Sequence, residues 1–325
     1  MKAIRMHEPG EPEVLKLEEV DTPEAGPGEV LVRVALAGVN YADTGVRRGM
    51  FHGPDAAAMP MTPGFEVSGM VEKLGEGVEG FEEGARVVAV LGTGGYAEYA
   101  AVPVDSLVEI PDGVDYLQAT ALLVQGITAY GVLHDSARVQ PGESVLVQAA
   151  AGGVGTLAVQ LAKLAGAETV VGTASTVEKR NLAESLGADR TVDYTRDGWV
   201  EEVLEAAGGW GVDVVLESVG GEAGGQTYGC LAPLGRLVTF GAAGGEGLAP
   251  PDMWQLNMQG QTVSGYGGPW IRPGAAEEAR EKISNYLPSG ELKVVEGPSF
   301  GLEKAAEAHR AVEGRATVGK VTLTT

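Results

Sequence analysis

The sequence predicts an α/β protein with a β-rich first domain and a second domain built on a doubly wound parallel sheet. Three observations lead to this prediction. The chain has 325 residues, which is too long for one small domain. Short apolar strands separated by glycine- and proline-rich turns fill roughly its first third. From Glu143 onward strands and helices alternate, as is typical of right-handed βαβ units.

The first third contains four runs that read as short strands, the first of them alternating and rich in valine and leucine. These runs predict strands at 29–40, 64–75, 85–92 and 96–103, and one short helix at 41–48. Turn segments such as GPGE and GEGVEG separate the strands. Several short strands at this spacing favour a small barrel or sandwich.

The pattern changes after Pro111, where a long apolar stretch of helical type covers 115–133. Six strands are then predicted at 144–148, 169–172, 190–193, 212–217, 236–241 and 261–265, and five helices between them at 153–165, 176–186, 199–207, 222–231 and 251–258. The tail reads as helices at 275–287 and 302–312 and a strand at 318–323. We therefore expect domains at 1–122 and 123–265, with 266–325 returning to complete the first domain.

Charge and composition exclude several classes of protein. The net charge of −22, from 23 basic and 45 acidic residues, repels nucleic acid and anionic lipid, although it also serves solubility alone. We see no apolar run of the roughly eighteen residues that a membrane span needs, and no secretory leader. The only cysteine, Cys230, excludes an intramolecular disulfide and a multi-cysteine zinc site. We expect a cytoplasmic protein without membrane or nucleic-acid partners.

The segment VLVQAAAGGVGTLAVQ, 145–160, places three glycines where a strand becomes a helix. Glycine permits the dihedrals of a tight turn and lets backbone N–H groups approach a ligand. The N-terminus of the following helix carries partial positive charge, which suits a pyrophosphate. The spacing Ala149-x-x-Gly152-x-x-Gly155 is a variant of the dinucleotide fingerprint with alanine first. The alternative is a tight turn that packs helix on strand and binds nothing.

The end of the next predicted strand indicates which dinucleotide binds. NAD-binding proteins place an acidic residue there to hold the ribose 2′-hydroxyl. This chain instead reads GTAS at 172–175, followed by Lys179 and Arg180. Hydroxyl and cationic side chains favour a 2′-phosphate, which a carboxylate would repel. The sequence thus favours NADPH over NADH, unless Lys179 and Arg180 are ordinary exposed helix residues.

Several segments together resemble one family. GESVLVQAAAGGVGTLAVQLAK at 142–163 resembles the signature of the zeta-crystallin-like quinone oxidoreductases, within the medium-chain dehydrogenase/reductase superfamily. AGVNYADTGVRRGMF at 37–51, TPGFEVSGMVEKLGEGVEGFEEGARV at 62–87 and the tail AHRAVEGRATVGKVTL are also similar to it. The resemblance implies a GroES-like β-barrel catalytic domain, a Rossmann domain, a cleft between them and a homodimer joined through Rossmann strands.

The resemblance also implies the activity: NADPH-dependent reduction of quinones or similar activated enones by hydride transfer, without a metal. It assigns Asn40 to the nicotinamide side, and Asp43 and Arg47 to the same motif, as the catalytic set. Ser175, Lys179 and Tyr194 are similar to residues that hold the 2′-phosphate.

Two further loops, Phe240–Gly241 and Ser264–Tyr266, resemble loops that cradle the nicotinamide through backbone groups. The complete set of cofactor-binding candidates is Asn40, Gln125, Thr128, Ala151, Gly152, Gly153, Val154, Gly155, Thr173, Ser175, Lys179, Tyr194, Ser218, Val219, Phe240, Gly241, Ala242, Ser264, Tyr266 and Lys320.

Zinc alcohol dehydrogenases share this overall pattern but need a cysteine and a histidine where this chain has Asn40 and Phe65. We therefore predict no metal. A quinone or enone is already electrophilic, and the anion left by hydride addition is delocalised, so alignment of the reactants can replace an obligatory general acid.

Two rival functions remain open at this stage. One is an enal or enoyl-thioester reductase on the same fold, and the other is a non-catalytic NADPH-binding redox sensor. The remaining candidates have plainer interpretations. Cys230 and His309 are predicted to be structural, as is Glu66; His52 is a loop residue; and Trp254 and Trp270 are expected in an aromatic core rather than a pocket.

Overall fold

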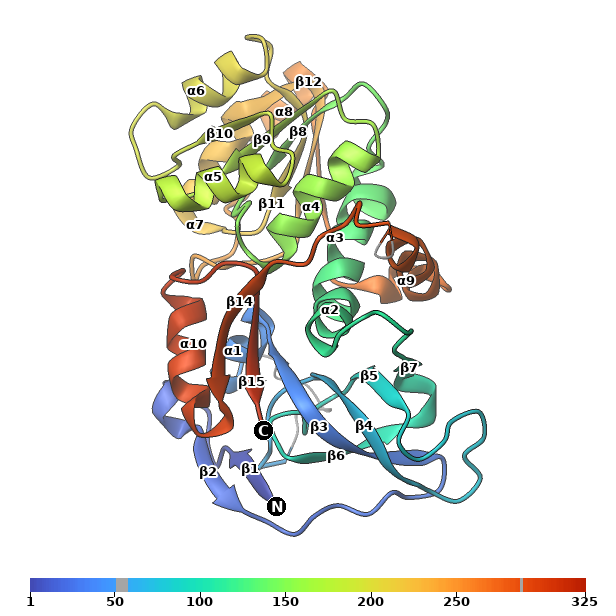
Figure 1. Cartoon of the computed structure of the whole chain (residues 1–325). Coiled ribbons are helices and arrows are strands. Elements are labelled where there is room, and N and C mark those ends of the chain that lie inside the picture. Colours follow the sequence, from blue (N-terminus) through green and yellow to red (C-terminus); the bar gives the residue numbers. More distant parts are fainter. Residues whose placement is uncertain (51–57, 287–288) are drawn as a thin grey trace. The chain divides into compact units, whose positions relative to one another are not determined.

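The computed structural model describes residues 1–50, 58–286 and 289–325, so His52 and Phe51 lie outside the described residues (Figure 1). The chain divides into two compact units. The first unit contains Met1–Val124 and Glu296–Thr325, and the second contains Gln125–Val295.

The second boundary differs from the sequence-based expectation. Residues 266–295 belong to the second unit, and the return to the first begins at Glu296 rather than at 266. Helix α9 (Ala275–Tyr286) packs on α3 (Ile127–Gly131) of the same unit. The Gln160 side chain also binds the backbone of Lys293 through both of its ends, at 2.8 and 2.9 Å. These contacts join segments far apart in sequence, which local periodicity does not reveal.

The second unit is built on a six-stranded, wholly parallel sheet in the order β10-β9-β8-β11-β12-β13 (Figure 1). Its strands are β8 (Ser144–Val147), β9 (Thr169–Thr173), β10 (Arg190–Val192), β11 (Val212–Glu217), β12 (Leu231–Thr239) and β13 (Thr262–Gly265). The order reverses between β8 and β11, which is the topological switch of a doubly wound fold. The prediction of this sheet is confirmed, and each predicted strand is present.

Helices connect these strands as predicted: α4 (Gly153–Leu164), α5 (Val177–Ser185), α6 (Trp199–Ala206), α7 (Gly221–Gln226) and α8 (Met253–Gln259). The apolar face of α4, including Leu157, Ala158 and Leu161, is buried. Helix α7 is shorter than expected, because a 3-10 turn follows it at Thr227–Cys230 and β12 already begins at Leu231. Cys230 is buried and free, in agreement with the structural interpretation.

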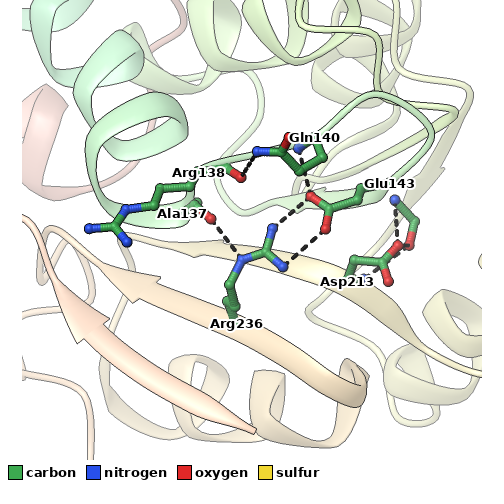
Figure 2. A network of polar contacts seen from close by, with 7 residues as sticks. Ala137, Arg138, Gln140, Glu143, Asp213 and Arg236 are labelled. Carbon is green, nitrogen blue, oxygen red and sulfur yellow. Dashed lines mark hydrogen bonds and ion pairs between the residues drawn. The ribbon is translucent and has the colours of Figure 1, made fainter.

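A polar network closes the amino ends of three neighbouring strands (Figure 2). The Arg236 guanidinium donates to both oxygens of Glu143, at 3.0 and 2.6 Å, and to the Ala137 carbonyl at 2.7 Å. Asp213 accepts from both the backbone N–H and the hydroxyl of Ser144, each at 2.7 Å. These side chains bind one another and fix the loop that enters β8.

An apolar helical run, Tyr116–Ala137, links α2 (Tyr116–Ala121), α3 and two π-helical segments (Leu122–Gly126 and Val132–Ala137). By length and composition it could cross a membrane, and it is the one such helix in the described part of the chain. Its most apolar window is 72% buried within the protein, as in the core helix of a globular fold.

The first unit contains a seven-stranded mixed sheet in the order β14-β15-β3-β4-β5-β7, with β6 also paired to β3. The strands are β3 (Glu29–Val39), β4 (Glu66–Leu74), β5 (Arg86–Val90), β6 (Tyr99–Pro103), β7 (Leu107–Glu109), β14 (Glu296–Gly301) and β15 (Lys320–Thr324). Beside them lie α1 (Tyr41–Arg47) and α10 (Ala305–Glu313). The long strand β3 joins the predicted N-terminal strands to β15 from the C-terminal tail.

The sequence did not reveal the short antiparallel pair β1 (Lys2–Arg5) and β2 (Lys16–Glu19), nor β7 and β14. The placement of two tryptophans in an aromatic core is wrong, because Trp254 is 71% exposed and Trp270 is 79% exposed. Their apolar neighbours in sequence did not distinguish a core from a surface patch.

Candidate active site

The glycine turn follows β8 at the carboxyl edge of the parallel sheet. Ala149 has a φ of 49°, in the left-handed region that favours glycine, and its carbonyl accepts from Gly152 N–H at 2.8 Å. A Cβ on Gly155 would lie 2.2 Å from that carbonyl oxygen, so only glycine fits there. Gly152 caps α4 without any side-chain bond, which leaves the first amides of the helix available to an anion. Ala151 and Val154 lie within the same turn.

Gln125 reaches this turn from a π-helical segment of the same unit. A Cβ on Gly153 would lie 2.1 Å from Gln125 Nε2, so the glycine makes room for the Gln125 amide. Thr128, one helical turn further on, is half-buried. The structure therefore places the Gln125 amide against the glycine turn, a contact that local sequence periodicity does not show.

The residues 172–175 at the end of β9 offer hydroxyl groups and no carboxylate, and the nearby carboxylates of Glu178 and Asp193 interact with Thr176 and Arg180. Thr173 is fully buried, and its hydroxyl has no hydrogen-bond partner in the described structure. Thr176 begins α5 and accepts from Lys179 N–H at 3.3 Å, with Ser175 just before it. The Arg180 guanidinium pairs with Asp193 at 2.8 Å and donates to the Ala174 carbonyl at 3.3 Å.

Tyr194 follows Asp193 after β10 and is half-buried. In a parallel sheet the carboxyl ends of all strands meet at one edge, so Tyr194 shares this edge with Thr173, Ser175 and Lys179. A glycine cradle, a helix N-terminus, an unpartnered buried hydroxyl and the absence of an acid at β9 all fit a phosphorylated dinucleotide.

Glu217, which sequence reasoning did not select, organises the next loop. Its carboxylate is fully buried and accepts from the N–H groups of Val219 at 2.7 Å and Gly220 at 2.6 Å. It also accepts from the Thr239 hydroxyl at 3.1 Å. These bonds fix the loop containing Ser218 beside the topological switch. The sequence feature that could have pointed to Glu217 is a single carboxylate between a buried strand and two glycines, in LESVGG.

The two loops expected at the nicotinamide follow β12 and β13. Phe240 N–H donates to the Glu217 carbonyl at 2.9 Å, and Gly241 and Ala242 come directly after it. Ser264 is exposed on β13, whereas Tyr266 is buried and lies against Gly131, where a Cβ would meet its hydroxyl oxygen at 2.2 Å. The Tyr266 side chain is therefore occupied inside the unit, and its backbone N–H donates to the Thr239 carbonyl at 2.9 Å.

The first unit holds a separate buried cluster around Asn40. Asn40 Oδ1 accepts from Lys320 Nζ at 3.0 Å, and Asn40 Nδ2 donates to Glu66 Oε2 at 3.0 Å. Lys320 also pairs directly with Glu66, and both side chains are fully buried. Glu66 Oε1 in turn accepts from Val124 N–H at 2.9 Å. A Cβ on Gly38 would meet Glu66 and Lys320, so this glycine makes space for the ion pair.

These contacts give Lys320 an internal partner, although the resemblance implies a cofactor role for it. They also fix the orientation of the Asn40 amide, because a lysine can only donate and a carboxylate can only accept. The second N–H of the amide takes part in neither of these bonds.

Asp43 and Arg47 lie on α1 and are fully buried. Burial raises the pKa of Asp43 to about 7, against the lowering effect of the Asn40 N–H that donates to it at 2.7 Å. Arg47 binds both oxygens of Glu313, at 2.7 and 3.0 Å, and the Gly10 carbonyl at 2.9 Å. The structure places Arg47 in an internal ion pair rather than on an open surface.

A zinc site is the remaining possibility that the fold family raises. The described residues contain no group of three or more histidine, cysteine, aspartate or glutamate side chains arranged to hold a metal ion. At the positions expected to carry ligands, Asn40 is bound to Glu66 and Lys320, and Phe65 offers no donor atom. The residues present do not fit a catalytic zinc.

Comparison with known proteins agrees with this arrangement. Residues 26–112 match the alcohol dehydrogenase GroES-like domain family, and residues 153–282 match the zinc-binding dehydrogenase family. The chain is 34% identical to a quinone oxidoreductase of Pseudomonas aeruginosa, covering 99% of both chains. It is also 34% identical to a 2-haloacrylate reductase of a Burkholderia species, covering 99% of this chain and 98% of the relative.

Among solved structures, the Escherichia coli quinone oxidoreductase complexed with NADPH is similar, with a TM-score of 0.91, 31% identity and complete coverage of both chains. The expected GroES-like and Rossmann architecture is confirmed by these matches. This chain belongs to the quinone oxidoreductases of the medium-chain dehydrogenase/reductase superfamily.

Proposed function

We propose that this protein is an NADPH-dependent oxidoreductase that reduces quinones and similar activated enones. The observation that carries the proposal is the carboxyl edge of the parallel sheet, where the glycine turn at Gly152 meets a β9 end without a carboxylate. Full-length similarity to quinone oxidoreductases, one of them solved with NADPH, supports both the cofactor and the small-molecule acceptor.

The chemistry divides simply between cofactor and protein. NADPH supplies a hydride, and the acceptor is already electrophilic, so the chain mainly binds and aligns the two. The amides at the start of α4 bind the diphosphate, and the loop held by Glu217 shapes the floor of the site. We propose that Asn40 contacts the reacting ligand through its remaining N–H, while Asp43 and Arg47 support it.

A direct assay tests the function. The purified protein is mixed with NADPH and a panel of quinones and enones, and loss of NADPH absorbance is followed. We expect turnover with at least one quinone. Tight NADPH binding without turnover of any acceptor would instead support the redox-sensor alternative.

A second candidate is the reduction of an α,β-unsaturated acid, ester or thioester. The similarity to a 2-haloacrylate reductase favours it, because that substrate class also accepts hydride at an activated carbon–carbon double bond. Including acrylates and enoyl thioesters in the same panel distinguishes the two, through the ratio of kcat/KM values.

The preference for NADPH is tested at the end of β9. We expect Lys179→Ala to weaken NADPH binding by about tenfold, the loss of one charge-assisted contact, while NADH binding stays unchanged. Arg180→Met is the matched comparison, because the family resemblance assigns Lys179 and not Arg180 to the 2′-phosphate, and the Arg180 guanidinium pairs with Asp193. Equal loss of both coenzymes in Lys179→Ala would contradict the 2′-phosphate assignment.

We further propose a homodimer joined through β13, the last strand of the sheet. Residues Thr262, Ser264 and Gly265 of this strand are exposed, and α8 nearby exposes Met253, Trp254 and Met258 by 65%, 71% and 65%. An open strand edge beside an apolar patch favours pairing with a second copy. Sedimentation should show a dimer that a Trp254→Glu, Met258→Glu variant converts to monomer; a wild-type monomer would contradict the proposal.

We also propose a cytoplasmic location.

A further inference from the structure

Four buried polar side chains of the first unit form a chain that leads toward Asn40. Arg47 Nη1 lies 3.5 Å from His309 Nδ1, and His309 Nε2 lies 3.1 Å from the Tyr96 hydroxyl. Burial raises the pKa of Asp43 and the Tyr96 hydroxyl acts to lower it, and the Asp43 carboxylate accepts from Asn40 N–H at 2.7 Å. The residues come from α1, α10 and the segment before β6, so the chain joins elements distant in sequence.

The direction of these hydrogen bonds follows from the chemistry of their ends. An arginine can only donate, so the Nδ1 atom that faces Arg47 must be the unprotonated nitrogen of His309. Burial lowers the pKa of His309 to about 3, which keeps the ring neutral. The ring proton therefore lies on Nε2 and points at the Tyr96 oxygen. The Tyr96 proton is then left to point at Asp43.

One carboxylate oxygen of Asp43 still needs a hydrogen-bond donor. Its Oδ2 atom accepts from Asn40 N–H, but Oδ1 is buried and has no hydrogen-bond partner among the described residues. An unsatisfied buried carboxylate oxygen is costly, and a tyrosine hydroxyl is the donor type that it needs. Burial, followed by the charge of Asp43, raises the pKa of Tyr96 well above its usual value, so the hydroxyl keeps its proton.

The surrounding backbone makes room for this arrangement. Gly64 has a φ of 89°, and a Cβ there would lie 2.2 Å from the Tyr96 ring. Gly38 makes room in the same way for the Glu66–Lys320 pair that holds the Asn40 side chain. Two glycines of the family-like motifs thus accommodate the two groups that hold Asn40, one at its backbone and one at its amide.

We propose that Tyr96 is a positioning residue: its hydroxyl, oriented by His309, donates to Asp43 and thereby holds the Asn40 backbone at the start of α1. This positioning role goes beyond the proposed function. Only the measurement of turnover rests on that function.

The proposal has a consequence for titration. The groups that act on Asp43 are the Asn40 N–H on its own element, Lys320 on β15, Glu66 on β4 and Tyr96 before β6, with Arg47 and His309 one contact further away. Asp43 titrates at about pH 7, and Tyr96 lowers its pKa. Removing the hydroxyl must therefore raise the pH at which Asp43 ionises, and the ionised form is the one that holds Asn40 N–H most strongly.

The test follows the Asn40 backbone amide of the full-length protein by NMR as a function of pH. We expect a midpoint at about pH 7 in wild type and, in Tyr96→Phe, a midpoint about one pH unit higher, the value of one hydrogen bond. Where quinone turnover is present, the acid limb of kcat should move by the same amount. Thr120→Val is the control, because it removes another fully buried hydroxyl, bonded to Ser68 and Tyr116 of the same unit.

A second pair of variants keeps the test valid if Tyr96→Phe does not fold. His309→Leu removes the donor that orients Tyr96 and should raise the midpoint, whereas His309→Gln retains an N–H and should restore it. An unchanged midpoint in Tyr96→Phe or His309→Leu, or an equal shift in Thr120→Val, overturns the proposal. Because the amide readout needs no turnover, a shifted midpoint in a protein that reduces no quinone refutes the proposed activity alone.

Discussion

The two ends of the parallel sheet in the second unit contrast in how their polar groups are satisfied. At the amino ends, Arg236 binds Glu143 and Asp213 binds Ser144, so side chains satisfy one another (Figure 2). At the carboxyl ends, the α4 amides have no side-chain cap and the Thr173 hydroxyl has no partner among the described residues. Strand β8 thus has a closed network at its amino end and open donors after its carboxyl end.

The difference shows which polar groups find their hydrogen-bond partners within the protein and which do not. A closed network contributes stability and offers nothing to bind, whereas open donors at a helix N-terminus gain their partners from an anion. Gln261, at the amino end of β13, has an unpartnered Oε1, yet its amide group donates to two backbone carbonyls. The contrast therefore depends on the donors of the glycine turn. Three substitutions and one control variant test it.

The largest effect is expected from Gly152→Asp at the open end. Gly152 has extended backbone, with φ −76° and ψ 175°, which aspartate adopts readily and which suits an N-cap. The new carboxylate should cap α4 and preserve or raise stability, while it repels the diphosphate. We expect NADPH affinity to fall by about 100-fold, or roughly 2.7 kcal/mol, in calorimetric titration.

Gly152→Ser separates charge from bulk in that experiment. Serine also caps a helix and adds a Cβ at the same place, 3.2 Å from the Ala149 carbonyl, but carries no charge. It should lose far less affinity than the aspartate variant. Equal losses would mean that space rather than charge governs this end of the sheet.

An intermediate effect is expected from Arg236→Met at the closed end. The substitution leaves Glu143 without its two strongest bonds and should lower the free energy of unfolding by about 2 kcal/mol. Denaturant unfolding measures this loss, and NADPH affinity should stay within about twofold because the network lies at the end of the sheet opposite the glycine turn. A large loss of affinity with stability unchanged would reverse the roles assigned to the two ends.

The smallest effect is expected from Thr173→Val, which replaces the unpartnered hydroxyl by a methyl of similar size. Removing a buried, unsatisfied polar atom should leave stability unchanged or raise it by about 1 kcal/mol, as thermal unfolding would show. If the hydroxyl serves the cofactor, NADPH affinity falls by about three- to tenfold at the same time. A loss of stability would instead show that Thr173 has a structural partner.

Much of the second unit could be predicted because its signals are local. Strand–helix alternation fixed the parallel sheet, and the glycines between β8 and α4 marked its ligand-binding edge before any contact was known. The absence of an acid after β9 is likewise visible in four consecutive residues. Each of these features depends on neighbours within a few positions in the chain.

Other features depend on residues that are close only after folding. Glu217 gave little sign of its three hydrogen bonds, and Trp254 looked like a core residue although it lies on the surface. Likewise, the segment after residue 265 was assigned to the first domain, since nothing local shows that α9 packs on α3.

The sequence by itself determined the fold class, the glycine turn at the carboxyl edge of the sheet and the family, because strand and helix periodicity and the conformational freedom of glycine are properties of short segments. Only the tertiary structure decided which buried charges meet. Lys320 lies 254 positions from Glu66, and His309 lies 213 positions from Tyr96. A charge or hydroxyl inside the protein must find its partner across the fold, and that pairing leaves no periodic trace in the chain.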